Sequence, residues 1–495
     1  FFLDFFISAV NRLSTIPIAS LYFHYVPLLV SFGIAFGLYA LVVAWTKRRD
    51  AGLWAVFLGL FGGSFGYILK IQGHTEISLM SVLGMDQAAT AILNPPFAFS
   101  LLLIVSALIL IFYYSKTHRI GWLYLLALVV GISPMFKIYA GIILFSGFCI
   151  LTIIELLQRR FVVFLPFSLA IGLALVTYGV FSGPGNYLIF VPLWSPHSML
   201  IANLPWYGFE EKFYTYTKLG VIRGLIEIET YGLVLFILGN LGTRLFGVLT
   251  HGITWIFKRN SLSLFAWTLS TMISTSILIP LFFIQSVKVF DIIQLAFYFP
   301  FLCAIVGAYG LAQIHNKTIP KLLQLLLVCS IILATLPSAY ETFILYVLTP
   351  KIRTPLSDFQ PFHYLQTHGT YDDTVLEMPP ASLIHSKENM IKWYHGSNAK
   401  FSAFGNKRSY FNSTEIDFPN LDIEGRANYL TTVLALASSS GSLKTDKKNA
   451  FKFVEKLKIE KIKYIFSSYP LSVASISSNL KQAHTSNGII IYQID

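Results

Sequence analysis

The sequence predicts a polytopic α-helical membrane protein that ends in a small α/β domain. Hydrophobic residues make up 55% of the 495-residue chain and charged residues only 12%, about half the charged fraction of a soluble protein. Mean hydropathy is +0.65, and apolar runs of membrane-spanning length recur as far as Pro350. The first residue is Phe1 rather than Met, inside a helical pattern, so we expect that the natural N-terminus lies upstream.

Ten membrane-spanning segments are predicted in a domain of residues 1–349. A helix over Phe1–Ser20 precedes them and is expected at the membrane interface, because three polar residues interrupt its apolar run. The fourth span is short for a full crossing. The expected spans are Tyr25–Trp45, Leu53–Lys70, Phe97–Tyr114, Ile120–Pro134, Ile138–Leu157, Phe161–Phe181, Tyr231–Thr250, Leu262–Ile284, Ile292–Ile314 and Leu322–Val347.

Lysine and arginine residues alternate between the loops that join these spans. One set of loops carries basic clusters, as at residues 47–49 and 159–160, and the other set carries few. The positive-inside rule places the first set in the cytoplasm. The Gly73–Pro96 loop, the 182–230 loop and everything after Leu348 are then expected outside. Much of the formal charge of +12 follows this pattern, which argues against a nucleic-acid partner.

The 182–230 loop is the longest polar stretch within the membrane domain, and it is rich in aromatic residues. Aromatic side chains favour the depth of the lipid headgroups. We therefore expect one or two amphipathic helices in this loop, lying on the outer leaflet.

The second domain is predicted over residues 350–495, where short alternating runs and helical patterns follow one another. This alternation is typical of an α/β domain, and the length suffices for a core of its own. The expected strands are Thr374–Glu377, Lys463–Ser467 and Gly488–Gln493. The expected helices are Phe359–Thr367, Asn449–Leu457 and Leu471–Gln482.

The Gly73–Pro96 loop carries the first candidates for chemistry. Its carboxylates, Asp86 and Glu76, can act as a general base or bind a divalent metal ion; the alternative is a solvated loop. His74 is a possible ligand or a hydrogen-bonded structural histidine. The sequence has no zinc, phosphate-loop, dinucleotide or serine-hydrolase motif, and its three cysteines lie in apolar segments without metal-ligand spacing.

Basic residues next to the predicted spans are candidates for binding a lipid phosphate. Lys137 lies alone between two apolar helices, where an ammonium group must reach the interface or meet an anion. Lys288 and Asp291 flank the entrance of a span, either as a local pair or as the lining of a headgroup pocket. Arg223 and Lys218 can hold a diphosphate, or they contact ordinary anionic lipid.

Several stretches resemble the GT-C superfamily of integral-membrane glycosyltransferases, in the bacterial branch near the protein O-mannosyltransferase and lipid A aminoarabinose transferase families. The membrane stretches that carry the likeness are FFLDFFISAVNRL, LNPPFAFSLLLI, GISPMFKIYAGII and VKVFDIIQLAFYFPFL. Those of the tail are FHYLQTHGTYDDTVLEMPP, FGNKRSYF, IEKIKYIFSS and IIIYQID.

The resemblance implies transfer of a sugar from a polyprenyl-phosphate donor at the outer face of a bacterial cytoplasmic membrane. It places a catalytic aspartate, with a divalent metal ion such as Mg²⁺ or Mn²⁺, in a first outer loop that lies before Phe1. Asp86, or Glu76, then assists on the acceptor or metal side. Lys137, with Arg223 or Lys288, holds the donor phosphate, and the outer domain binds the acceptor or covers the site.

Two other functions remain open from the sequence. A transporter or flippase also needs many spans, but it requires charged or broken helices in mid-membrane, and the sequence shows few charges within spans. A scaffold or sensor would use the spans only as an anchor for an outer ligand-binding domain.

Overall fold

The computed structural model describes residues 2–73, 78, 81–85, 87–88, 94–181, 187–204, 208–258, 263–286, 289–313, 320–344, 359–370, 372–378, 408–409, 447–471, 474 and 477–495. The chain divides into two compact units, Phe1–Pro350 and Lys351–Asp495. This division falls next to the domain boundary expected from the sequence. Each unit is described by itself below.

In its described residues, the first unit consists of helices and one two-stranded ribbon. The ribbon pairs β1 (Leu188–Phe190) antiparallel with β2 (Phe283–Gln285). The helices are α1 (Phe2–Ser14), α2 (Ile18–Ser20), α3 (Val26–Thr46), α4 (Arg49–Val56), α5 (Gly66–Ile71), α7 (Pro95–Thr117), α8 (Gly121–Phe136), α9 (Ile138–Leu157), α10 (Phe164–Phe181), α11 (Trp194–Asn203), α12 (Phe209–Leu219), α13 (Ile222–Val234), α14 (Arg244–Lys258), α15 (Leu264–Phe282), α16 (Tyr298–Ala312) and α17 (Lys321–Phe343).

Short wide or tight helical turns join several of these helices. The wide π-type turns are η1 (Leu21–Tyr25), η2 (Phe57–Phe61) and η5 (Leu235–Gly239). The tight 3₁₀ turns are η3 (Phe161–Val163) and η6 (Val289–Leu295). Two of the π-type turns, η2 and η5, come immediately before breaks in the chain's helical path, as π-bulges often do at irregular sites.

Among the described residues, six helices are long and apolar enough to cross a membrane, or seven if one sharply bent pair is a single span. These helices make the chain an integral membrane protein. The six are Leu21–Thr46, Pro95–Thr117, Ile138–Leu157, Leu264–Phe282, Val289–Ala312 and Lys321–Phe343. The prediction of ten spans is therefore too high, and the orientation that it implied stays a prediction.

Four of the ten expected spans fail for two physical reasons. The helix Gly121–Phe136 is apolar but shorter than a full span; at 1.5 Å per residue, 16 residues cover only about 24 Å. Over the residues whose side chains are described, the apolar helix Phe161–Thr177 is also shorter than a span, although its backbone continues to Phe181. The expected spans Leu53–Lys70 and Tyr231–Thr250 are interrupted. The first is divided between α4, η2 and α5, and the second bends by 93° between Gly239 and Arg244.

The two interruptions meet in space, and glycine makes the meeting possible. Gly242 has a φ of +55°, a left-handed conformation that L residues with side chains rarely adopt. A Cβ atom at this position would lie 1.8 Å from the carbonyl oxygen of Gly63. The amide of Phe65 also donates to the carbonyl of Gly239 at 2.7 Å. The second broken segment is thus packed directly on the first.

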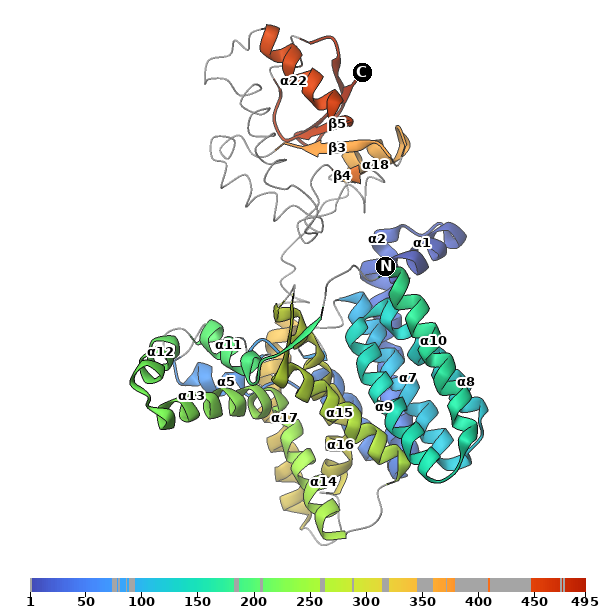
Figure 1. The fold of residues 1–495 in the computed structure, drawn as a ribbon, viewed down its shortest axis with the longest axis vertical. Coiled ribbons are helices and arrows are strands. Elements are labelled where there is room, and N and C mark those ends of the chain that lie inside the picture. The colour runs from blue at the N-terminus through green and yellow to red at the C-terminus, as the bar shows by residue number, and fades with distance from the viewer. Residues whose placement is uncertain are drawn as a thin grey trace. The chain divides into compact units, whose positions relative to one another are not determined.

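Helices α3, α7, α8, α9 and α10 pack side by side in one bundle (Figure 1), and α15 lies against α9. A second group forms around α16, which packs on α14 and α4. In that group Gly247 and Gly310 bring the backbones of α14 and α16 together. A Cβ on Gly310 would lie 1.9 Å from the carbonyl oxygen of Gly247, and a Cβ on Gly247 would lie 2.0 Å from that of Gly307. Small residues allow such close approach between membrane helices.

The 182–230 region contains helices, as the aromatic content predicted, but there are three rather than one or two. Helices α11, α12 and α13 follow one another and pack together. Helix α12 buries no residue, and exposed apolar side chains continue from Tyr214 to Ile226. Their location on the outer leaflet stays a prediction.

The second unit contains the expected mixture of helices and strands. Its five-stranded sheet has the order β4-β3-β5-β7-β6. The described strands are β3 (Thr374–Glu377), β4 (Arg408–Ser409), β5 (Ile462–Ser467), β6 (Leu480–Ser486) and β7 (Ile489–Ile494), and the described helices are α18 (Gln360–Thr367) and α22 (Lys447–Ile459). Strands β3, β4 and β5 run parallel, and β7 is antiparallel to both β5 and β6.

The helix expected over Leu471–Gln482 is wrong. Strand β6 begins at Leu480 and forms a hairpin with β7. The turn consists of Asn487 and Gly488, with φ values of +49° and +72°. An Asn-Gly pair with two positive φ angles is the preferred two-residue hairpin turn, so this dipeptide was the signal that the helical interpretation overlooked.

Candidate functional site

Helix α9 connects two polar clusters that lie at its opposite ends. Lys137 precedes its first residue, and Glu155 lies in its last turn. The helix has 20 residues, a length of about 30 Å, which matches the hydrocarbon thickness of a bilayer. The two clusters therefore lie one membrane thickness apart.

The first cluster joins Lys137 with Asp291, two of the residues predicted from sequence. Lys137 is half-buried, and burial lowers its pKa while the carboxylate of Asp291 opposes this shift. Asp291 accepts a hydrogen bond from Nε2 of Gln294 at 3.2 Å. The ammonium and the carboxylate thus act on each other. The predicted pairing of Asp291 with Lys288 stays a prediction, because Lys288 lies outside the described residues.

Tyr139 and the ribbon complete this cluster. The hydroxyl of Tyr139 donates to Oε1 of Gln285, in β2, at 3.3 Å, and Nζ of Lys137 lies 5.7 Å from the centroid of the Tyr139 ring. Lys137 is also the N-terminal boundary residue of α9, where unpaired backbone amides present positive charge. A desolvated ammonium, a phenol and a helix N-terminus converge here, which suits a negatively charged group such as a phosphate.

The structure does not bring the other predicted residues into this cluster. Arg223 is exposed and forms an ion pair with Glu227, one turn further along α13, at 2.9 Å. Lys218 is exposed on α12. The predicted residues Asp86, Glu76, His74 and Lys288 lie outside the described residues.

The divalent metal ion expected from the sequence stays a prediction. Both of its predicted carboxylate ligands, Asp86 and Glu76, are among the positions outside the described residues. In the part of the chain that the structure describes, no group of three His, Cys, Asp or Glu side chains is suited to a metal ion.

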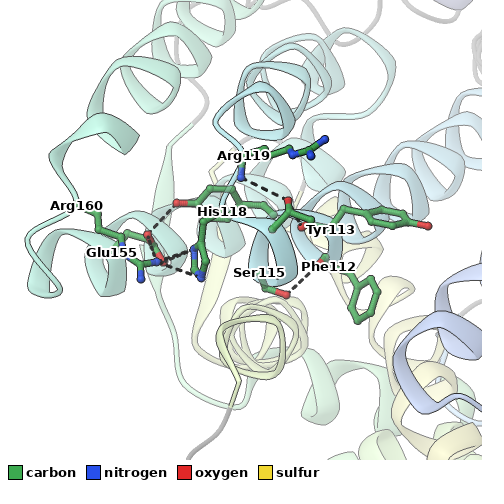
Figure 2. A network of polar contacts seen from close by, with 9 residues as sticks. Phe112, Tyr113, Ser115, His118, Arg119, Glu155 and Arg160 are labelled. Atoms are coloured by element: carbon green, nitrogen blue, oxygen red, sulfur yellow. Dashed lines mark hydrogen bonds and ion pairs between the residues drawn. The ribbon is translucent and has the colours of Figure 1, made fainter.

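The second cluster surrounds Glu155 and was missed from sequence (Figure 2). The Glu155 side chain is only 1% exposed. Its Oε2 accepts a hydrogen bond from the buried hydroxyl of Tyr114 at 2.8 Å, and both carboxylate oxygens lie 3.3 Å from Nη1 of Arg160. Nδ1 of His118 lies 2.6 Å from the same Arg160 nitrogen. The carboxylate is thus held by a phenol and a guanidinium.

Two tight helix ends bring these side chains together. Helix α7 ends at His118 (φ +49°) and α9 is followed by Arg159 (φ +63°), both in the left-handed region. A signal for the cluster was present in the sequence. A carboxylate in the last turn of an apolar helix faces the negative end of the helix dipole, so it requires a cationic partner such as the arginine pair at 159–160.

A third polar cluster lies where the two broken segments meet, and Arg244 is its centre. The side chain is fully buried. Its Nε donates to the carbonyl of Leu58 at 2.9 Å and its Nη2 to that of Gly62 at 2.6 Å. These carbonyls belong to η2 and its end, the negative pole of a helix.

Glutamine and asparagine side chains extend this buried cluster. Nη1 of Arg244 donates to Oε1 of Gln87 at 2.8 Å, and Nε2 of Gln87 donates to the carbonyl of Asn240 at 3.2 Å. Oδ1 of Asn240 accepts from the amide of Val82 at 3.1 Å. The loop on both sides of position 86 is therefore attached to the broken segment by hydrogen bonds.

Comparison with known proteins assigns no family. No family model matches the chain, and no curated protein sequence matches it.

Proposed function

We propose that the chain is a membrane glycosyltransferase that moves a sugar from a polyprenyl-phosphate donor to an acceptor outside the cytoplasm. The single observation that carries this proposal is the half-buried Lys137 at the N-terminus of a spanning helix, beside Asp291 and Tyr139. The phosphate of a membrane lipid lies where spanning helices end. A cation at that depth meets the donor without drawing it out of the membrane.

The proposed reaction needs stabilisation of the leaving phosphate. A hydroxyl oxygen of the acceptor attacks the anomeric carbon of the sugar and loses its proton to a base. The bond between that carbon and the phosphate oxygen breaks, and its electron pair remains on the polyprenyl phosphate. Negative charge thus develops on this oxygen, and a preorganised cation in a dry site stabilises it far more than one in water does. Lys137 is assigned this role.

Asp291 and Tyr139 keep the ammonium in place. The carboxylate of Asp291 favours the charged form of Lys137 against the effect of burial. Tyr139, bonded to Gln285 of the ribbon, limits the space on one side of the ammonium. Asp86 or Glu76 remains the proposed acceptor-side carboxylate, and the second unit is the proposed acceptor-binding domain.

Binding of polyprenyl monophosphate tests the proposal before any sugar is known. The purified protein in nanodiscs is titrated with this lipid, and Lys137→Gln is compared with Lys321→Gln, an exposed lysine at the start of α17. We expect Lys137→Gln to weaken binding of the lipid at least tenfold, a loss of about 1.4 kcal/mol in binding free energy. Lys321→Gln is expected to bind the lipid as the parent protein does. Equal binding by both variants would reject Lys137 as the phosphate ligand.

A second candidate function, lipid or sugar transport, is favoured by the broken helices around Arg244. Discontinuous helices with buried charge are a feature of transporters, and the sequence had suggested that such charges were scarce. Each guanidinium nitrogen of Arg244, however, already donates to a described partner, so a structural role explains it. Proteoliposomes distinguish the two: transport without sugar transfer would favour this second function.

A further inference from the structure

The Glu155 cluster leaves part of its arginine free to bind a ligand. Nη1 of Arg160 contacts both Glu155 and His118. Its Nε and Nη2 atoms have no partner among the described residues, and the side chain is 42% exposed. The buried carboxylate thus fixes the guanidinium through Nη1. Nε and Nη2 remain as donors in the planar arrangement that suits phosphate oxygens.

The residues around Arg160 give this surface a strong positive charge. Lys116 and Arg119 flank the end of α7, and Arg159 precedes Arg160; all three are exposed. Four positive side chains and one carboxylate give a net formal charge of +3 with His118 neutral. Because Glu155 is buried, the accessible part of the cluster is cationic throughout.

An exposed apolar band adjoins the charged surface. Leu157, Phe161 and Val162 lie next to the arginine pair in sequence, and each is at least two-thirds exposed. Helix α10 continues the band with Phe164 and Leu165. A cationic surface next to exposed apolar side chains at the end of a spanning helix matches the two halves of a phospholipid, its phosphate and its acyl chains.

We propose that Arg160, supported by Glu155 and flanked by Lys116, Arg119 and Arg159, binds the headgroup phosphate of an anionic phospholipid. This site lies at the opposite end of α9 from Lys137 and does not depend on the proposed transferase function. The acyl chains lie along Phe161 and its neighbours. The ligand is a lipid rather than free phosphate because exposed apolar side chains directly precede and follow the arginine pair in the chain.

Native mass spectrometry of the detergent-solubilised protein tests the site, with phosphatidylglycerol as the anionic probe and phosphatidylcholine as the neutral one. We expect Arg159→Gln and Arg119→Gln to weaken phosphatidylglycerol binding about fivefold each, since both leave the Glu155 contacts intact. The matched control is Arg49→Gln, which removes an exposed arginine from another basic loop. Phosphatidylcholine binding is expected to stay the same in all variants.

The central residue is tested in a form that avoids an unpaired buried charge. Glu155→Gln with Arg160→Gln keeps a hydrogen-bonded pair, and thermal unfolding verifies its fold. Loss of tight phosphatidylglycerol binding in this double variant supports the proposal. Three results would overturn it: unchanged binding in the folded double variant, an equal loss in Arg49→Gln, or displacement of the lipid by millimolar inorganic phosphate. If the double variant does not fold, the two single variants decide.

Discussion

The two ends of α9 solve the same problem, a charge beside a hydrophobic slab, in different ways. At the N-terminal end a half-buried ammonium is balanced through Asp291, and no basic neighbour adds to it within the described cluster. At the C-terminal end a carboxylate is almost completely buried, and the cations around it are exposed. The first arrangement favours selective binding of one anion. In the second, a buried carboxylate holds an exposed, positively charged surface in place.

The difference has a consequence for stability. A buried charge that loses its partner is strongly destabilising, whereas a half-buried charge can reach water. We therefore expect substitutions at the Glu155 end to change folding, and substitutions at the Lys137 end to change ligand binding. The following variants test that division.

The largest effect is expected from Arg160→Gln. This change leaves the Glu155 carboxylate buried with only Tyr114 and His118 nearby, so the free energy of unfolding falls by about 3 kcal/mol. Glu155→Gln with Arg160→Gln removes the unpaired charge and restores most of the loss. Thermal unfolding in detergent measures both. If the single and double variants unfold at the same temperature, the ion pair does not anchor this end.

A smaller effect on stability is expected when the hydroxyl of a tyrosine is removed from either cluster, and its size should differ between the two clusters. Tyr114→Phe removes a hydrogen bond to a buried carboxylate, and bonds to charged groups contribute about 1.5–3 kcal/mol. Tyr139→Phe removes a longer bond to the neutral Gln285, which contributes about 0.5 kcal/mol. The unfolding temperatures of the two variants test this order. A larger decrease for Tyr139→Phe than for Tyr114→Phe would contradict it.

The sequence predicted the N-terminal cluster better than the C-terminal one. Lys137 and Asp291 are isolated charges at the edges of apolar runs, and that isolation marks them in a single sequence. Glu155 and Arg160 are five residues apart and resemble ordinary polar residues at a helix end. Their link to Tyr114 and His118 depends on α7 packing beside α9, a tertiary contact that no local pattern specifies.

The same limit explains the errors in the fold. Hydropathy located the apolar segments but did not show where their helices are interrupted. The interruptions at Gly62 and Gly242 depend on contact between the two broken segments, which are far apart in the sequence. The burial of Arg244 could not be predicted from local sequence, because its carbonyl partners come from residues about 180 positions earlier. The Asn487-Gly488 turn, by contrast, could have been predicted from local sequence and was missed.

The smallest effect is a change in the pH dependence of ligand binding at the Lys137 end. Binding of polyprenyl phosphate requires the ammonium form, so affinity falls as the pH rises through the pKa of Lys137. Burial places that pKa below its ordinary value, and the Asp291 carboxylate raises it. Asp291→Asn removes the raising effect, so we expect affinity to decline at a lower pH than in the parent protein.

The sign for folding is opposite to that for binding. The pKa of Lys137 is lower in the folded than in the unfolded chain, so the folded chain releases this proton first as the pH rises, and this group then favours folding more. Binding titrations and unfolding temperatures between neutral and alkaline pH separate the two effects. Two control variants accompany these measurements: Asp291→Gln, which also removes the carboxylate, and Lys137→Gln, which removes the titrating ammonium. If Asp291→Asn leaves the binding profile where it was, the carboxylate does not set the charge of Lys137, and the phosphate site must be explained without it.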